Sequence, residues 1–164
     1  MNYCPNCGKK LFDNIIDNTK VKSCSCGFVD WNNYCFVVAV SLSFKDNKLL
    51  MVRLKGKEDN KMTFPGGYRN LGETIEEACK REAFEESGYI IDNLKLYKTY
   101  TKDEQRLVWI VFTADVIEGY FKENSETKEV IFIDDKTNEE DINFRGQMTY
   151  KWYKDIMKDH YSKK

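Results

Sequence analysis

Three glutamates close together, Glu82, Glu85 and Glu86, are the residues whose type and spacing point most directly to chemistry. If residues 74–87 form a helix, about 100° of rotation per residue brings these carboxylates to the apolar face. They would then repel one another near the negative end of the helix dipole. A bound cation resolves this arrangement, and carboxylate ligands favour Mg²⁺ or Mn²⁺. The alternative is a solvated acidic helix.

The helix that must position these glutamates has recognisable ends. Thr74 is followed three residues later by Glu77, which is the pattern of a capping box, and Gly88 stands where a C-terminal glycine cap is expected. These signals predict a helix over residues 74–87. Its first turn carries acidic residues that suit the positive end of the dipole, whereas the last turns carry the clustered glutamates.

Residues 67–89 resemble the Nudix box. The pattern is Gly, five residues, Glu, seven residues, Arg-Glu, an apolar residue, any residue, Glu-Glu, any residue, Gly and an apolar residue. The corresponding residues here are Gly67, Glu73, Arg81, Glu82, Ala83, Glu85, Glu86, Gly88 and Tyr89, so every fixed position is filled. The resemblance implies a Nudix α/β/α sandwich with a mixed sheet. It also implies a metal-dependent hydrolase of nucleoside diphosphates linked to a further moiety.

The resemblance assigns roles to residues within the box. It implies that Glu82, Glu85 and Glu86 hold the Mg²⁺ ion, with Glu82 also counted among the catalytic residues. Glu73 is expected to support catalysis, binding the metal through water. From its spacing, Arg81 is expected to hold carboxylates in place through ion pairs.

Two further residues outside the box belong to the expected site. Nudix enzymes often use a glutamate downstream of the box as a ligand or base, and Glu129, just before an apolar segment, fits that place best. Glu126 and Glu123 are alternatives. Arg53, at the end of an expected strand, is a candidate contact for the diphosphate, and a solvated strand-end charge is the competing interpretation.

The N-terminal segment carries two cysteine pairs, Cys4 with Cys7 and Cys24 with Cys26. Four thiolates suit tetrahedral Zn²⁺. The segment resembles the zinc ribbon that precedes the catalytic domain in some Nudix hydrolases, including the NADH pyrophosphatase group. The second pair is separated by one residue instead of the usual two, which leaves open a role for Cys35. The alternative to a zinc site is that the four cysteines are free structural thiols.

Length and charge limit the possible functions. A chain of 164 residues can form one sizeable core with a small appendage. We expect a zinc ribbon over residues 1–32 and a Nudix hydrolase domain over residues 33–164. The formal net charge of -1 provides no global field for nucleic acid. No apolar stretch predicts a membrane span or secretory signal, so we expect a cytoplasmic, reducing location and read the cysteines as metal ligands.

Apolar and β-branched runs predict the remaining elements. The expected strands are residues 34–44, 48–54, 90–100, 106–117 and 129–133, with Asp46-Asn47 as the turn of a hairpin. Residues 147–160 are expected to form a last helix with its apolar residues at helical spacing. Mixed strands and two helices indicate an α/β fold.

The substrate is the least determined part of the prediction. ADP-ribose or a nucleotide sugar is favoured, because the two prolines, Pro5 and Pro65, exclude the proline-bearing downstream motif of NADH pyrophosphatases. NADH or NAD remains an alternative, as does a non-catalytic, nucleotide-sensing protein whose zinc ribbon binds nucleic acid. The chain could also form a homodimer. Aromatic candidates for stacking on a base are Tyr68, Tyr100, Trp109 and Phe144.

Overall fold

The computed structural model describes residues 1–32 and 34–161. Contacts between Cα atoms divide the chain into two compact units, Met1–Cys35 and Phe36–Lys164. The predicted second domain begins at Asn33 and ends at residues 162–164, and these positions lie outside the described residues. Among the described residues, neither helix has the length and apolar composition needed to span a bilayer.

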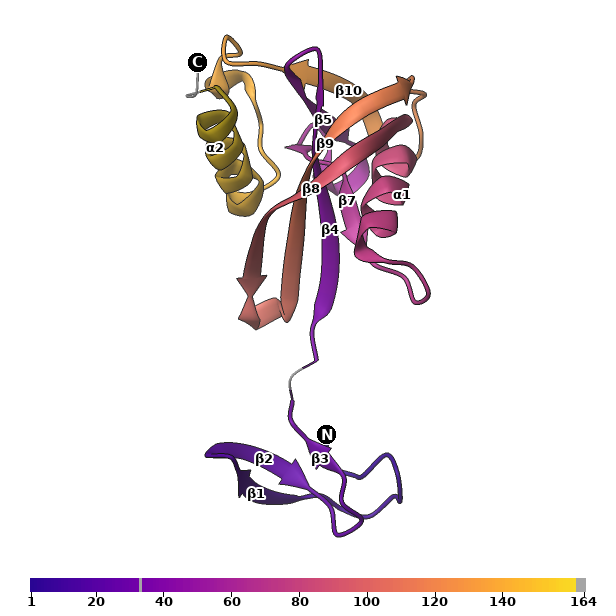
Figure 1. Ribbon diagram of the computed structural model, residues 1–164, viewed down its shortest axis with the longest axis vertical. Helices are drawn as coiled ribbons and strands as arrows, with labels where there is room; N and C mark the ends of the chain where they lie inside the picture. The colour runs from indigo at the N-terminus through magenta and orange to yellow at the C-terminus, as the bar shows by residue number, and fades with distance from the viewer. Residues whose placement is uncertain (33, 162–164) are drawn as a thin grey trace. The chain divides into compact units, whose positions relative to one another are not determined.

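The first unit is built around a small antiparallel sheet. Strands β1 (Phe12–Ile16), β2 (Thr19–Ser23) and β3 (Val29–Asp30) pair in that order. Asp17 and Asn18 join the first two strands with positive φ angles of 48° and 59°, as a tight two-residue hairpin turn requires. Figure 1 shows strands β1 and β2 of this hairpin, which lies in the sequence between Cys7 and Cys24.

The second unit contains a seven-stranded mixed sheet in the order β10-β5-β4-β9-β8, with β6 paired to β5 and β7 paired to β4. Among the strand pairs that the described residues form in this sheet, β4–β9 is the parallel one and the others are antiparallel. The strands are β4 (Phe36–Lys45), β5 (Lys48–Leu54), β6 (Met62–Thr63), β7 (Gly66–Tyr68), β8 (Tyr89–Lys102), β9 (Leu107–Gly119) and β10 (Thr127–Ile133). The helices are α1 (Ile75–Ser87) and α2 (Gln147–Tyr161), and the 3-10 turns are η1 (Gly56–Glu58), η2 (Asp103–Gln105) and η3 (Glu139–Asp141).

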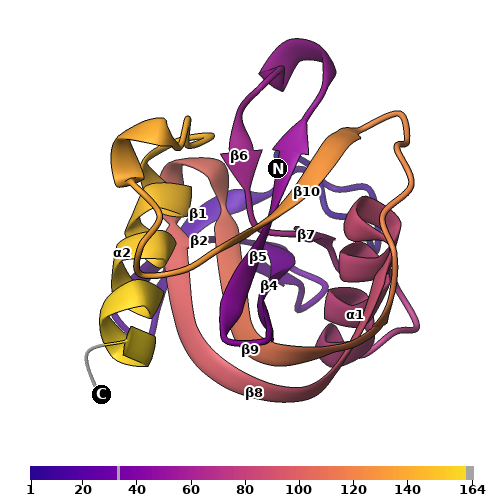
Figure 2. The same ribbon diagram turned by 90° about the horizontal axis from the view of Figure 1, so that it is seen from above.

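The two helices cover opposite faces of the sheet (Figures 1 and 2). Alternation along β4 shows why: Val38 and Val40 belong to the same buried cluster as Trp152 of α2. Ala39, between them, belongs to the cluster that contains Ala78 and Cys79 of α1. Successive side chains of a strand point to opposite faces, so β4 contributes to both apolar layers. The predicted α/β/α sandwich is confirmed.

Strands β4 and β5 separate soon after their hairpin, and this separation creates the place where the box begins. They pair only at Phe44 with Leu49 and at Lys45 with Lys48. Farther along, β7 pairs with residues 38–40 of β4 and β6 pairs with the end of β5. The short strand β7 was not predicted from the sequence, because two glycines in three residues give no strand signal.

The predicted elements are otherwise confirmed, with ends that differ by at most two residues. Helix α1 begins at Ile75 after Thr74, and the expected strand at residues 34–44 begins at Phe36. The hairpin turn is confirmed, since Asp46 and Asn47 both have positive φ angles. Element ends fray and are the least well specified part of a sequence pattern.

Candidate active site

Helix α1 has the caps that its sequence predicts. The Thr74 hydroxyl accepts a hydrogen bond from the Glu77 backbone N–H at 3.1 Å, and the Glu77 carboxylate accepts one from the Thr74 N–H at 2.7 Å. At the other end Gly88 has a φ of 73° and donates its N–H to the Phe84 carbonyl. Defined ends at both termini fix the length of the helix and therefore the rotation of its glutamates.

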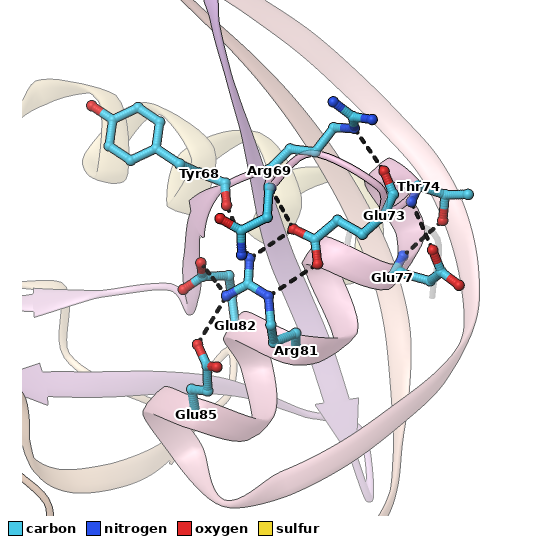
Figure 3. Close-up of polar contacts among 9 residues, drawn as sticks. Tyr68, Arg69, Glu73, Thr74, Glu77, Arg81, Glu82 and Glu85 are labelled. Atoms are coloured by element: carbon cyan, nitrogen blue, oxygen red, sulfur yellow. Dashed lines mark hydrogen bonds and ion pairs between the residues drawn. The ribbon is translucent and has the colours of Figure 1, made fainter.

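Arg81 joins the first and last parts of the box. Its guanidinium donates two hydrogen bonds to Glu73, at 2.9 and 3.1 Å, and one each to Glu82 at 2.7 Å and Glu85 at 2.9 Å (Figure 3). A fifth hydrogen bond, at 2.9 Å, reaches the Tyr68 carbonyl in β7. The expectation that Arg81 holds carboxylates is confirmed by these contacts.

The contact with Arg81 stabilises the ionised form of Glu73. Its hydrogen bonds to Arg81, and then the Asn70 N–H that it accepts at 2.5 Å, lower its pKa to about 2. The loop before α1 is further fixed by Arg69, whose Nε donates to the Glu73 carbonyl at 2.7 Å. Glu73 is thus a structural anchor between this loop and the helix.

Glu82 and Glu86 lie on the side of α1 that faces β7. Burial raises the pKa of Glu86 to about 8, although the Gly66 N–H donates a hydrogen bond to its Oε2 at 2.9 Å. Burial also raises the pKa of Glu82, whose side chain is 15% exposed. Glu126 raises both pKa values further by charge repulsion. Glu82 and Glu86 therefore lie where neighbouring carboxylates disfavour their ionised forms.

Glu85 differs from its neighbours on α1. Its side chain is 56% exposed, so the prediction that all three glutamates share the buried face is wrong for this residue. Glu85 is at the edge of the helix, where it forms its ion pair with Arg81 and still raises the pKa of Glu82.

The donor set is suited to a hard divalent cation. Glu82 and Glu86 are partly buried carboxylates with raised pKa values, and the negative charge of Glu126 adds to their need for a positive partner. Oxygen-only ligands of this kind match Mg²⁺ or Mn²⁺. The residues present therefore fit the group that the box implies.

Asn124 holds Glu126 beside α1. The sequence patterns did not indicate a role for Asn124. The Asn124 side-chain amide donates to the Glu85 carbonyl at 3.1 Å, and its oxygen accepts the N–H groups of Glu126 at 2.9 Å and Thr127 at 2.7 Å. The Glu126 carbonyl accepts the Lys55 N–H at 2.8 Å. An Asn that caps its own turn two residues on is a local signal, but its contact with Glu85 spans 39 positions.

Glu129 and Arg53 form a pair with each other. They face one another in the register of β10 and β5, and their side chains make an ion pair. Neighbouring side chains on adjacent strands interact in this way when their charges are opposite. The structure therefore brings together two residues that the sequence had placed in separate roles.

The four N-terminal cysteines converge in the first unit. The Sγ atoms of Cys4, Cys7, Cys24 and Cys26 all lie within 4.8 Å of one another. Among the described residues this is the one group of His, Cys, Asp and Glu side chains whose ligand atoms gather so closely. Cys35 is exposed and does not belong to the group. The geometry suits a single tetrahedral ion.

The aromatic candidates fall into two classes. Tyr100 donates its hydroxyl to Asp155 at 2.8 Å, and Phe144 packs on Tyr153 with ring centroids 4.9 Å apart, so both tie α2 to the rest of the fold. Tyr68 and Trp109 instead line a cavity next to the box.

Comparisons with known proteins agree with this geometry. A family model described as the NUDIX domain matches residues 36–152. The chain is similar to an ADP-ribose pyrophosphatase of Methanocaldococcus jannaschii, with 37% identity over 95 residues, 55% of this chain and 56% of the relative. It is also similar to the NAD-capped RNA hydrolase NudC of Vibrio atlanticus, with 28% identity over 127 residues, 74% of this chain and 45% of the relative.

The chain thus spans about half the length of the curated relatives it matches. Among solved structures, a NUDIX hydrolase from Nitrosomonas europaea superposes with a TM-score of 0.75 at 21% identity, covering 99% of this chain and 93% of that chain. This likeness concerns the fold.

Proposed function

The chain belongs to the Nudix family of hydrolases, since the family model covers residues 36–152, and we propose that it hydrolyses the diphosphate bond of a nucleoside diphosphate linked to another moiety. The reaction depends on Mg²⁺ or Mn²⁺. ADP-ribose or a nucleotide sugar is the favoured substrate.

The observation that carries this proposal is the raised pKa of Glu86, to about 8, in a setting where Glu82 and Glu126 add further negative charge. At neutral pH such a cluster takes up a proton unless a metal cation binds in its place. A bound Mg²⁺ supplies neutralisation of the diphosphate and activation of a water molecule. Glu82, Glu86 and the more exposed Glu85 are the proposed ligands.

For the base that takes the proton from water, the contacts favour Glu126 over Glu129. Glu126 lies near enough to Glu82 and Glu86 to raise the pKa of both. Glu129 is paired with Arg53 on the neighbouring strand, so its carboxylate is already engaged by a guanidinium. The same pair occupies the Arg53 guanidinium, so Arg53 would reach a diphosphate only by leaving Glu129.

The roles of Glu73 and Arg81 follow from their mutual contacts. The pKa of Glu73, lowered to about 2, makes it unsuitable as a proton acceptor near pH 7 and suitable as a fixed negative partner for Arg81. We propose that this pair holds Glu82 and Glu85 in place. Glu73 acts on the reaction through these contacts.

The names of two relatives support the proposed substrate class. One is named an ADP-ribose pyrophosphatase, and the other an NAD-capped RNA hydrolase. ADP-ribose and NAD each contain a diphosphate that joins adenosine to a second group. NADH or NAD is accordingly the second candidate, and the missing proline motif keeps ADP-ribose or a nucleotide sugar ahead of it.

For the first unit we propose a structural Zn²⁺ ion held by Cys4, Cys7, Cys24 and Cys26. The closeness of their Sγ atoms supports this assignment. A homodimer and a cytoplasmic location remain predictions from the sequence.

Separation of the reaction products by anion-exchange chromatography tests the proposed hydrolysis, because cleavage of a linked diphosphate gives two phosphomonoesters and releases no inorganic phosphate. Purified protein with Mg²⁺ is offered ADP-ribose, NADH, NAD⁺, nucleotide sugars and nucleoside triphosphates, and Glu86→Gln is assayed in parallel. We expect turnover of a linked nucleoside diphosphate by the wild type and a loss of at least about 100-fold in the variant. Equal inertness of both proteins on every compound would reject the hydrolase function.

A further inference from the structure

A cavity of about 780 Å³ lies next to the acidic residues of the box. Gly66 and Gly67 of β7 form part of its lining. Gly66 donates its N–H to Glu86, and a side chain at Gly67 would overlap the Glu82 carboxylate. The cavity therefore shares β7 with the proposed metal site, and its volume is in the range of pockets that bind small molecules.

Arg145 lies in the wall of this cavity just before α2. Its backbone is fixed to β6, because its N–H donates to the Met62 carbonyl at 2.9 Å and the Met62 N–H donates to Asn143 at 2.8 Å. Phe144 also forms an isolated parallel bridge with Met62. These backbone contacts fix the point in the cavity wall from which the Arg145 side chain extends.

Arg145 brings a positive charge to the cavity wall that it shares with Gly66, whose N–H contacts Glu86. Within residues 1–32 and 34–161 it makes no ion pair of 4.0 Å or less. Arg53 and Arg81, by contrast, are engaged with glutamates. Arg145 is thus a cation available to an anionic ligand.

The remainder of the cavity suits an aromatic group. Trp109 lies in its wall, in edge-to-face contact with Trp152 at a centroid distance of 5.8 Å, and Tyr68 lies at its edge with the side chain 58% exposed. In Figure 3 the Tyr68 ring points away from the carboxylates that Arg81 holds. Gln105 and Gln147 add amide groups able to hydrogen bond with a base. Aromatic walls with a few polar groups are typical of nucleoside sites.

We propose that this cavity binds the nucleoside end of the substrate and that Arg145 contacts the adjacent diphosphate. The base packs against Trp109, and the diphosphate then extends past Gly66 and Gly67 to the glutamates. A planar guanidinium can donate two parallel hydrogen bonds to one phosphate. This inference rests on the proposed function for the place of the scissile bond, and it assigns the recognition of phosphate to Arg145 in preference to Arg53.

Binding of ADP, measured by tryptophan fluorescence in the presence of Mg²⁺, tests the proposal without requiring turnover. The chain has three tryptophans, and a Trp31→Phe background leaves the two in the cavity wall. We expect ADP to change the fluorescence of this protein and the Trp109→Phe variant to lose most of that change. Arg145→Gln should weaken ADP binding by at least about tenfold, and Arg145→Lys by less.

Adenosine and a charge-matched variant provide the controls. Adenosine carries no phosphate, so Arg145→Gln should change its affinity by less than about threefold. Lys158→Gln removes one positive charge from α2, the helix that follows Arg145, at an exposed residue outside the cavity, and should leave ADP affinity unchanged. Equal ADP affinity in the wild type and Arg145→Gln would overturn the proposal, as would an ADP signal that persists fully in Trp109→Phe.

The same experiment separates this proposal from the proposed function. If the wild type hydrolyses a substrate while Arg145→Gln retains its ADP affinity, only the role of Arg145 fails. If ADP binding depends on Arg145 and Trp109 but no compound is hydrolysed, the cavity assignment holds and the hydrolase function fails. In a protein that does turn over, Arg145→Gln should raise KM more than it lowers kcat.

Discussion

The Gly66 backbone N–H donates a hydrogen bond to the Glu86 carboxylate at 2.9 Å, which ties β7 to the acidic end of α1. The hydrogen bond stabilises the ionised form of Glu86, yet burial outweighs it and the pKa rises to about 8. One N–H group is therefore an incomplete partner for this carboxylate. This incomplete pairing is why we propose a cation at the site, and why the stability of the protein without a cation should depend on pH.

Without added Mg²⁺, the protein should lose stability as the pH rises from about 5 to about 8. The pKa of Glu86 in the folded protein, about 8, is above its ordinary value of 4.5, so in this window the folded state binds more protons than the unfolded state. The free energy of unfolding then decreases with rising pH. Urea denaturation at several pH values measures this slope.

Two comparisons isolate the contribution of Glu86. Glu86→Gln should show a shallower decline over the same window, and Mg²⁺ added at pH 8 should restore stability to the wild type more than to the variant. Glu73 does not interfere, because its pKa of about 2 leaves it ionised throughout. Identical slopes for the two proteins would contradict the assignment of Glu86 as the buried, unneutralised carboxylate.

The loop that carries Glu126 gives a prediction about the general base. Glu126→Gln should lower kcat by about 100-fold or more, the range usual for loss of a general base. Glu129→Gln should lower it by less than about tenfold, because Glu129 pairs with Arg53. Steady-state kinetics on the substrate found by screening, with ADP affinity checked in both variants, measures the difference. A larger loss in Glu129→Gln than in Glu126→Gln would return the role to Glu129.

The box helix illustrates what a sequence can specify. Thr74, Glu77 and Gly88 act within a few residues of each other, so their capping interactions are read directly from spacing, and the structure contains them. The burial of Glu82 and Glu86 likewise follows from helical periodicity. Glu85 departs from that pattern because the apolar face of α1 is narrow and Arg81, four residues earlier, holds Glu85 at its edge.

Contacts between distant segments explain what the sequence left open. Asn124 reaches Glu85 across 39 positions, and the pairing of β10 with β5 sets Glu129 opposite Arg53. Arg145 lies in the cavity wall because its backbone is bound to Met62 in β6. Each depends on strand register and loop path, which short-range spacing does not encode. The positions of Asn124 and Arg145 could therefore not be predicted from local sequence patterns.

The cysteine cluster predicts about one equivalent of zinc in protein purified without chelators. Cys26→Ser should reduce zinc to less than about half an equivalent, because it removes one of four thiolates. Cys35→Ser provides the matched control: Cys35 is exposed and outside the cluster, and its replacement should leave the zinc content unchanged. Elemental analysis measures both. Low zinc in the wild type, or equal loss in the two variants, would reject the proposed ligand set.

The close approach of Gly67 to Glu82 gives a prediction that couples the two residues. A Cβ atom at Gly67 would overlap the Glu82 carboxylate, so Gly67→Ala should displace that side chain and disturb its 2.7 Å contact with Arg81. We expect a loss of about 1–2 kcal/mol in stability, as for other overpacked sites, together with a fall in turnover of at least about tenfold. In a Glu82→Ala background the obstruction is gone, and Gly67→Ala should then cost less than about 0.5 kcal/mol. Urea denaturation of the four proteins measures this coupling. An equal cost in both backgrounds would show that Gly67 is required for a reason other than its contact with Glu82.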